Sequence, residues 1–139
     1  MDDTLQTSVP GIFSCGNVLH VHDLVDFVSD ESFRAGQSAA AYARGENADT
    51  ATIRVKDGAG VRGTVPQRIR AGVCQDVRLM FRPAGVYRGM CCVVRCGDEI
   101  VAKKRAPIFT PGEMVAVPLN AETVAGLSGA DLTVSIEEA

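Results

Sequence analysis

The chain has 139 residues, of which 46% are apolar, and its formal net charge is −3. This size and composition suit one globular core, or one small domain with an appendage. The sequence contains no run of 18 uncharged apolar residues, and its start, Met1-Asp2-Asp3, lacks the basic stretch and apolar core of a signal peptide. We therefore expect a cytoplasmic protein without a membrane span.

The charged residues divide the chain into two parts. Residues 1–49 carry eight acidic residues and two arginines, whereas residues 50–139 carry twelve basic and nine acidic residues. This asymmetry predicts two structural units with different neighbours. The basic residues alternate with apolar ones and have few aromatic residues near them, which is typical of solvated strand faces. We therefore expect no nucleic-acid partner.

The first predicted element is a short buried strand over residues 9–18. Turn-forming pairs flank its apolar part, with Pro10-Gly11 before it and Gly16-Asn17 after it. A loop that contains His20 and His22 follows. The N-terminal unit is therefore expected to begin as a strand and a loop.

A helix is predicted to begin at Ser29, whose side chain suits an N-cap, and to end at Gly45, which suits a C-terminal cap. One of its faces carries only small residues at helical spacing: Ala35, Gly36, Ala39, Ala40 and Ala43. Such a face lets the helix backbone pack closely on a partner. Little in the rest of the chain resembles a layer for this face, so its natural partner is expected outside the chain. In the isolated chain we expect it to contact a second copy, as a homodimer, or the β domain.

Beyond the polar segment 46–50, the chain changes to short β-branched runs separated by glycine and proline. We place the domain boundary here, with residues 1–49 as the N-terminal unit and residues 50–139 as an all-β domain. Seven strands are predicted, over 51–56, 62–65, 76–82, 89–95, 99–105, 114–117 and 131–137. Their spacing favours a mainly antiparallel, immunoglobulin-like β-sandwich. The predicted fold class is therefore α+β, with an N-terminal strand-loop-helix segment.

Smaller signals lie within the β domain. The residues Cys96-Gly97-Asp98 predict a hairpin turn, and a short helical turn is expected from Asn120 to Gly126. The segment Gly58–Gly63 fits the pattern G-x-G-x-x-G, but Thr64-Val65-Pro66 follows it and disfavours the helix that a dinucleotide site requires. We interpret it as a glycine-rich hairpin loop.

The five cysteines contain no C-x-x-C pair of the redox or zinc type, so reduced thiols are expected, mostly as small buried side chains. Cys91 and Cys92 are neighbours in a predicted strand and should point to opposite faces. No metal site is expected, because no third ligand of metal type lies at a supporting spacing from His20 and His22.

Two stretches carry the strongest functional signal. They are Thr7-Ser8-Val9-Pro10-Gly11-Ile12-Phe13-Ser14-Cys15-Gly16-Asn17 and, in the predicted helix, Ala35-Gly36-Gln37-Ser38-Ala39-Ala40. Together they resemble the second FAD motif of pyridine nucleotide-disulfide oxidoreductases, over about 40 residues and in the same order and spacing. In that family a Pro-Gly turn, an aliphatic and an aromatic residue precede a glycine and an aspartate, and a helix with an Ala-Gly pair follows.

The resemblance implies four FAD-binding residues and no catalytic residue in this chain. The backbone at Gly16 would approach the flavin, and Asn17, which stands where the family has aspartate, would hydrogen-bond the ribityl hydroxyls. The N–H groups around Val28 and Ser29 would face the isoalloxazine carbonyl. One of the two histidines could then donate a proton near the flavin, although a histidine in an acidic loop is more often an ordinary hydrogen-bonding residue.

The sequence lacks a phosphate-binding βαβ unit, a nicotinamide-binding unit and a redox cysteine pair, which such an enzyme needs. The resemblance therefore implies the C-terminal part of an FAD-dependent oxidoreductase. Its partners would be N-terminal FAD/NAD(P)-binding domains or a companion subunit, and the isolated chain is expected to be inactive and without FAD. The alternative is a non-catalytic β-sandwich interaction module. The substrate, the electron acceptor and the choice between NAD and NADP stay open.

Overall fold

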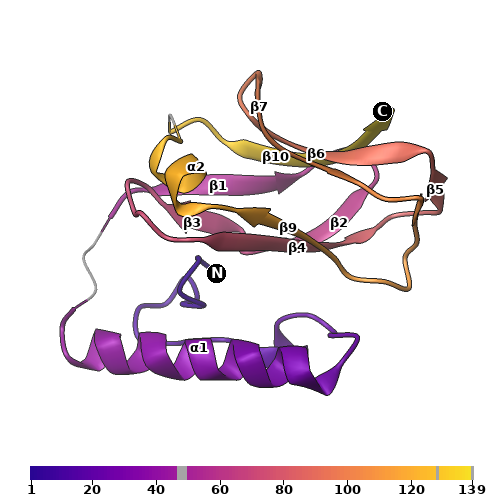
Figure 1. Ribbon diagram of the computed structural model, residues 1–139. Coiled ribbons are helices and arrows are strands. Elements are labelled where there is room, and N and C mark those ends of the chain that lie inside the picture. Colours follow the sequence, from indigo (N-terminus) through magenta and orange to yellow (C-terminus); the bar gives the residue numbers. More distant parts are fainter. Residues whose placement is uncertain (47–49, 128, 139) are drawn as a thin grey trace.

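The computed structural model describes residues 1–46, 50–127 and 129–138, and it is mostly β structure with one long helix (Figure 1). Residues 1–46, here called the arm, contain a short 3-10 helix, η1 (Gly16–Val18), and helix α1 (Val25–Ala43). The β domain follows, which gives the α+β arrangement that the sequence predicts. The predicted boundary after residue 49 adjoins residues 47–49, which lie outside the described residues. In the described part of the chain, no helix combines the length and apolarity that a membrane span requires.

The elements of the β domain are mostly short. In chain order they are β1 (Thr52–Asp57), β2 (Val61–Val65), β3 (Arg68–Arg70), β4 (Val77–Pro83), β5 (Tyr87–Arg88), β6 (Met90–Cys96), β7 (Glu99–Arg105), β8 (Ile108–Phe109), β9 (Val115–Leu119), α2 (Ala121–Ala125) and β10 (Leu132–Glu138).

These strands form two main sheets. One has the order β3-β1-β10-β6-β7, the other has the order β2-β4-β9, and β5 pairs with β8 separately. Strand β10 lies between β1, with which it runs parallel, and β6, with which it runs antiparallel. The remaining pairs are antiparallel, for example Leu79 opposite Val117 in β4 and β9.

The two main sheets bury a common core between them, as the two layers in Figure 1 indicate. Strand β4 shows the alternation that produces it, because Val77, Leu79 and Phe81 are buried while Arg78 is exposed. The facing layer contributes residues such as Val94 and Val134, which are also fully buried. The alternating apolar residues therefore decide which face of each sheet points inward.

The structure confirms the seven predicted strands, as β1, β2, β4, β6, β7, β9 and β10, with ends shifted by one or two residues. Strands β3, β5 and β8 were missed because they have only two or three residues. The predicted turn at Gly97 joins β6 to β7, and its φ of +59° suits glycine. Helix α2 also lies where predicted, and the Asn120 side chain caps it by accepting a hydrogen bond from the Thr123 N–H at 2.8 Å.

The predicted strand over residues 9–18 is wrong. The backbone there forms one isolated bridge, between Gln6 and Phe13, around a tight turn at Gly11, whose φ is +80°. Val9 and Ile12 are 52% and 54% exposed rather than buried. A strand requires a neighbouring strand to pair its backbone groups, and the segment forms no such ladder within the described chain.

The predicted start of the helix is also wrong, whereas its end is confirmed. Helix α1 begins at Val25 with Leu24 as N-cap, and the Ser29 hydroxyl donates back to the Val25 carbonyl at 3.2 Å. Serine can form this bond inside a helix, so its capping tendency does not fix the start. At the other end Gly45 has a φ of +73°, and its N–H donates to the Tyr42 carbonyl at 2.9 Å, as in a Schellman cap.

The glycine-rich segment 58–63 connects the two main sheets. Strand β2 begins inside it, at Val61, in agreement with the prediction that no helix follows. It is not a hairpin loop, however, because β1 and β2 belong to different sheets. The Asp57 carboxylate closes the connection by accepting hydrogen bonds from the Gly63 N–H at 2.7 Å, and from the N–H and hydroxyl of Thr64 at 2.9 and 2.5 Å.

These hydrogen bonds predict a pH dependence of stability. Partial removal from water raises the pKa of Asp57, but the hydrogen bonds from Thr64 and Gly63 outweigh this effect and the pKa is lowered. A lowered pKa in the folded state stabilises the fold above the unfolded aspartate pKa of about 3.9, and this contribution is lost as the pH falls through the folded value.

We expect Asp57→Asn to be less stable than wild type in urea at pH 7, with a difference that shrinks below pH ~4. Asp98→Asn is the control, since no hydrogen bond to its carboxylate is seen among the described residues. A difference that stays constant with pH would contradict this explanation.

The cysteines behave largely as predicted. Cys91, Cys92 and Cys96 are buried, whereas Cys15 is half-buried and Cys74 is exposed. Burial, together with the neighbouring Cys91, raises the pKa of the Cys92 thiol to about 12. Cys92 is therefore an unreactive core residue at neutral pH.

Candidate functional site

The arm lies beside the β domain, and an open cleft separates its helix α1 from that domain. Figure 1 shows α1 running along the outer side of the sheet that contains β4 and β9. The cleft has a volume of about 980 Å³, and its walls include Phe33 and Arg34 of α1 and Arg78 and Met80 of β4. Helix α1 therefore lies across a cleft from the sheet instead of being sealed against it.

One attachment of the arm lies at its start. The Asp3 side chain is 1% exposed and pairs with the Arg70 guanidinium, with an Oδ2–Nη2 distance of 2.9 Å. The same carboxylate accepts a hydrogen bond from the Arg70 N–H at 2.8 Å and another from the Gln75 side chain. Asp3 is thus a buried anchor for the arm.

A second attachment lies just before α1. The Asp23 carboxylate accepts a hydrogen bond from the Met114 N–H at 2.8 Å and pairs with the Arg82 guanidinium at 2.6 Å. These two contacts, the Met114 N–H first, lower the pKa of Asp23 against the opposing effect of burial. Arg82 also donates to the Val21 carbonyl at 2.9 Å, so the loop that carries the histidines is fixed to β4.

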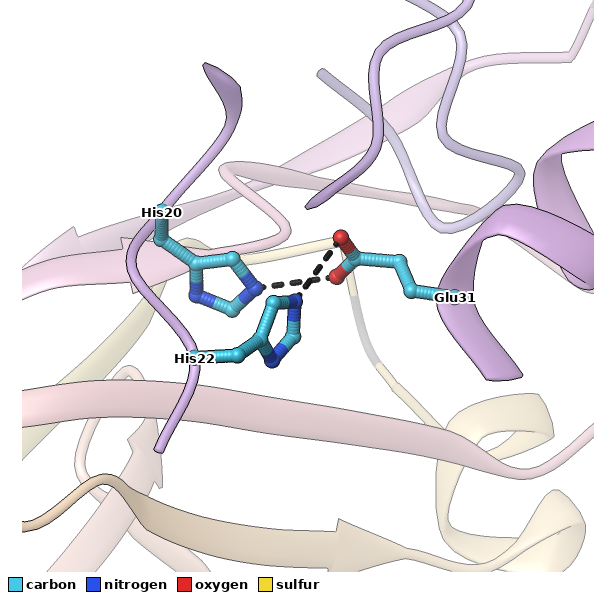
Figure 2. A group of neighbouring side chains, drawn as sticks. All are labelled: His20, His22 and Glu31. Atoms are coloured by element: carbon cyan, nitrogen blue, oxygen red, sulfur yellow. Dashed lines mark hydrogen bonds and ion pairs between the residues drawn. The ribbon is translucent and has the colours of Figure 1, made fainter. Parts of the chain in front are cut away.

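Between η1 and α1, the arm brings together two histidines and one glutamate. Figure 2 shows His20 and His22, from the loop, pointing toward Glu31, which extends from α1. The His20 Nε2 atom lies 2.9 Å from Glu31 Oε2, and the His22 Nε2 atom lies 3.0 Å from Glu31 Oε1. The three side chains are 9%, 2% and 3% exposed, respectively. We call these three residues the His-Glu cluster.

The local sequence explains how the cluster forms. His20 and His22 are separated by one residue, so in extended backbone both side chains point to the same side. Their rings meet edge to face, with centroids 4.3 Å apart. Gly16, whose φ is +67°, turns the chain so that its N–H donates to Glu31 Oε1 at 2.6 Å. Glu31 therefore holds both the glycine turn and the histidine loop.

The electrostatics of Glu31 follow from these partners. Removal from water raises its pKa, but hydrogen bonds from His22, His20 and the Gly16 N–H together lower it below its ordinary value. The carboxylate is therefore ionised at neutral pH despite its burial. In contrast, His20 Nδ1 is buried and has no hydrogen-bond partner within the described structure.

The structure brings two of the four predicted FAD-binding residues together and leaves the other two apart. Gly16 and Val28 lie together, because a Cβ added to Gly16 would be 3.3 Å from Val28 Cγ1. Asn17 is exposed, and its Oδ1 accepts one long hydrogen bond, 3.4 Å, from the His22 N–H. Ser29 is exposed on α1, one turn beyond Val25. Because α1 begins at Val25, the N–H groups without an intrahelical acceptor belong to the turn that starts there, and not to Val28 and Ser29.

Sequence reasoning missed Glu31 as a partner of the histidines. The expectation that no third ligand-type residue lies near them is corrected, since all three ligand atoms lie within 4.8 Å of one another. Glu31 is nine positions beyond His22 and two beyond Ser29, the predicted start of the helix. The only signal in the sequence was an acidic residue in a helix adjacent to two closely spaced histidines.

Comparison of the chain with protein-family models, with curated proteins and with solved structures found no match.

Proposed function

We propose that this chain is the C-terminal part of an FAD-dependent pyridine nucleotide-disulfide oxidoreductase. In this role the arm completes the flavin site, and the β domain, as an immunoglobulin-like sandwich, docks against another domain or subunit. The chain contributes binding and not chemistry. Its partner is the FAD/NAD(P)-binding part of the same enzyme, which supplies the pyrophosphate site and the nicotinamide site.

The observation that carries this proposal is the glycine turn packed on the helix. In the motif, a glycine backbone and the helix that follows it lie side by side near the flavin. Here Gly16 has a left-handed backbone, donates its N–H to Glu31 of α1 and lies against Val28. The next side chain, Asn17, is exposed, which leaves its amide available for a ligand hydroxyl.

The apolar surface of the arm supports a partner at this place. Among the described residues, eleven large apolar side chains are exposed, and nine of them belong to the arm. The nine are Val9, Ile12, Val18, Val21, Leu24, Val25, Phe27, Phe33 and Tyr42. Exposed apolar surface gathered in one region is typical of an interaction surface.

The first test uses the isolated chain. We expect titration calorimetry to show no sub-micromolar FAD binding, because most of the FAD contact surface belongs to the partner domains. Tight binding to the chain alone would overturn the proposal that it is a partial site.

The second test uses the assembled enzyme, purified through a tag on this chain, whose bound flavin is measured by visible absorption. Asn17→Leu is expected to weaken flavin retention by about 1–3 kcal/mol, or roughly 5- to 150-fold, because ribityl hydroxyls lose their partner. Asn17→Asp should be mild, since it keeps the acceptor. Two outcomes would favour the interaction module instead. In the first, the Asn17→Leu protein retains flavin as well as wild type does. In the second, the assembly is stable but contains no flavin.

The docking surface has its own matched pair of variants. The test variant is Phe33→Ser, at an exposed residue of α1. The control is Ile100→Ser, which makes an equivalent change at an exposed residue of β7, in the β domain. Phe33→Ser should reduce co-purification of the FAD/NAD(P)-binding part, whereas Ile100→Ser should not. Equal recovery with both variants would show that the arm is not the docking surface.

A further inference from the structure

We propose that the His-Glu cluster is a binding site for one divalent first-row transition-metal ion, of which zinc is a representative. The three residues present one ligand atom each within 4.8 Å of one another. This inference does not depend on flavin binding, and its test uses the chain alone.

The distances suit a shared ion. Histidine nitrogen and carboxylate oxygen bind zinc at about 2.0–2.2 Å, so two such ligands at angles between 90° and tetrahedral are about 3.0–3.4 Å apart. The two Nε2–carboxylate distances in the cluster are 2.9 and 3.0 Å. Small movements of the side chains would therefore convert the hydrogen-bonded group into a coordinating one.

The kind of ligand selects the kind of ion. Two imidazoles and one carboxylate suit zinc, iron(II), cobalt or nickel, whereas magnesium and calcium prefer oxygen ligands and copper(I) prefers sulfur. Three protein ligands leave a coordination position for water or a small ligand. His22 and Glu31 also line the 980 Å³ cleft, which gives an ion a route from solvent to the cluster.

The surroundings already orient the ligands. The Gly16 N–H holds Glu31 Oε1 at 2.6 Å, as hydrogen bonds from the backbone commonly do for metal-binding carboxylates. His20, which is nine-tenths buried, keeps one ring nitrogen without a hydrogen-bond partner among the described residues. This nitrogen is Nδ1, on the side of the ring away from Glu31, so Nε2 is the atom of His20 that would bind the ion (Figure 2).

Binding requires the coordinating nitrogen of each imidazole to be unprotonated. The Nε2 protons that now face Glu31 would move to Nδ1 or be released to solvent.

The experiment is a metal titration of the chain after treatment with a chelator. Cysteines 15 and 74 are replaced by serine in all proteins, because they are the two cysteines that are not buried and could bind metal themselves. We expect calorimetry with zinc to give one ion per chain at micromolar or lower Kd, and cobalt to give visible absorption bands without a sulfur charge-transfer band. His20→Gln and His22→Gln should each weaken binding by at least 100-fold, and Glu31→Gln by about 10- to 100-fold.

Asp26→Asn is the control, since it removes a carboxylate from the same helix outside the cluster and should leave the affinity unchanged. The helix content of each variant is checked by circular dichroism, and the wild-type cobalt spectrum tests the site even if a variant unfolds. The absence of saturable zinc and cobalt binding to wild type would overturn the metal site. Undiminished binding to the folded His20→Gln/His22→Gln double variant would do so as well. In either case the cluster would be a hydrogen-bonded clamp that only holds the loop to α1, and the flavin proposal would be unaffected.

Discussion

Replacing Asp3 with alanine is expected to destabilise the docked arm by about 3 kcal/mol. Removing one partner of a buried ion pair costs about 3–5 kcal/mol, because the other charge stays without compensation. The lower value applies here because the Arg70 side chain is 19% exposed and can regain some water. The Arg70 N–H and the Gln75 side chain would lose their acceptor as well.

Limited proteolysis within residues 1–46 measures this effect. When cleavage is slow, its rate follows the population of the released arm, so about 3 kcal/mol corresponds to roughly a 100-fold faster cut. Asp131→Ala is the matched control, because its partner Lys56 and Asp131 itself are 54% and 39% exposed. Such a surface pair contributes about 0–1 kcal/mol. If the arm of Asp3→Ala were cut at the wild-type rate, the attachment at Asp23 and Arg82 would suffice to hold it.

Replacing Gly58 with alanine is expected to lower the free energy of unfolding of the β domain by about 3 kcal/mol. An added Cβ would lie 2.2 Å from Ser135 Oγ and 2.9 Å from the Val134 carbonyl oxygen. The serine hydroxyl can rotate away, but the carbonyl belongs to β10 and accepts the Gly58 N–H at 2.8 Å. Strand β1 must therefore move away from β10, and overpacking of this kind costs about 1–3 kcal/mol.

Urea unfolding followed by circular dichroism tests this prediction. The control is Gly112→Ala, because an added Cβ there has only Thr110 Oγ1 within reach, at 4.0 Å. We expect the control to stay within about 0.5 kcal/mol of wild type. If Gly58→Ala were as stable as the control, β1 and β10 would be able to move apart without a loss of stability.

Gly58 is also the first glycine of the pattern G-x-G-x-x-G. The pattern G-x-G-x-x-G predicts a nucleotide site only when a helix follows, and here β2 follows. Gly58 is explained instead by its contact with β10, whereas Gly60 and Gly63 have φ values of +75° and +64°. The motif is therefore a requirement of the connection between two sheets.

The strands could be predicted because the information that defines them is local. In β4, apolar residues alternate with charged ones, and the buried positions follow this period of two. The order of the strands could not be predicted, since nothing in β1 specifies that it will lie beside β10. The three shortest strands carry too few residues for any period to be visible.

The site was less predictable, for a different physical reason. Gly16 and Asn17 lie in a recognisable motif, but the partner of the histidines was fixed by how α1 meets the loop. Moving the helix start from Ser29 to Val25 places Glu31 in the second turn, where its side chain reaches back to the loop. An error of four residues at the helix start therefore concealed the cluster.

The position of β10 has a consequence for how the domain is assembled. The parallel pair joins Val55 to Leu132, and β10 also separates β1 from β6 within its sheet. The central strand of the larger sheet is thus supplied by the most C-terminal of its five strands. Until it arrives, β1 and β6 have unpaired edges and the shared core is open to water, which slows folding and favours association between nascent chains.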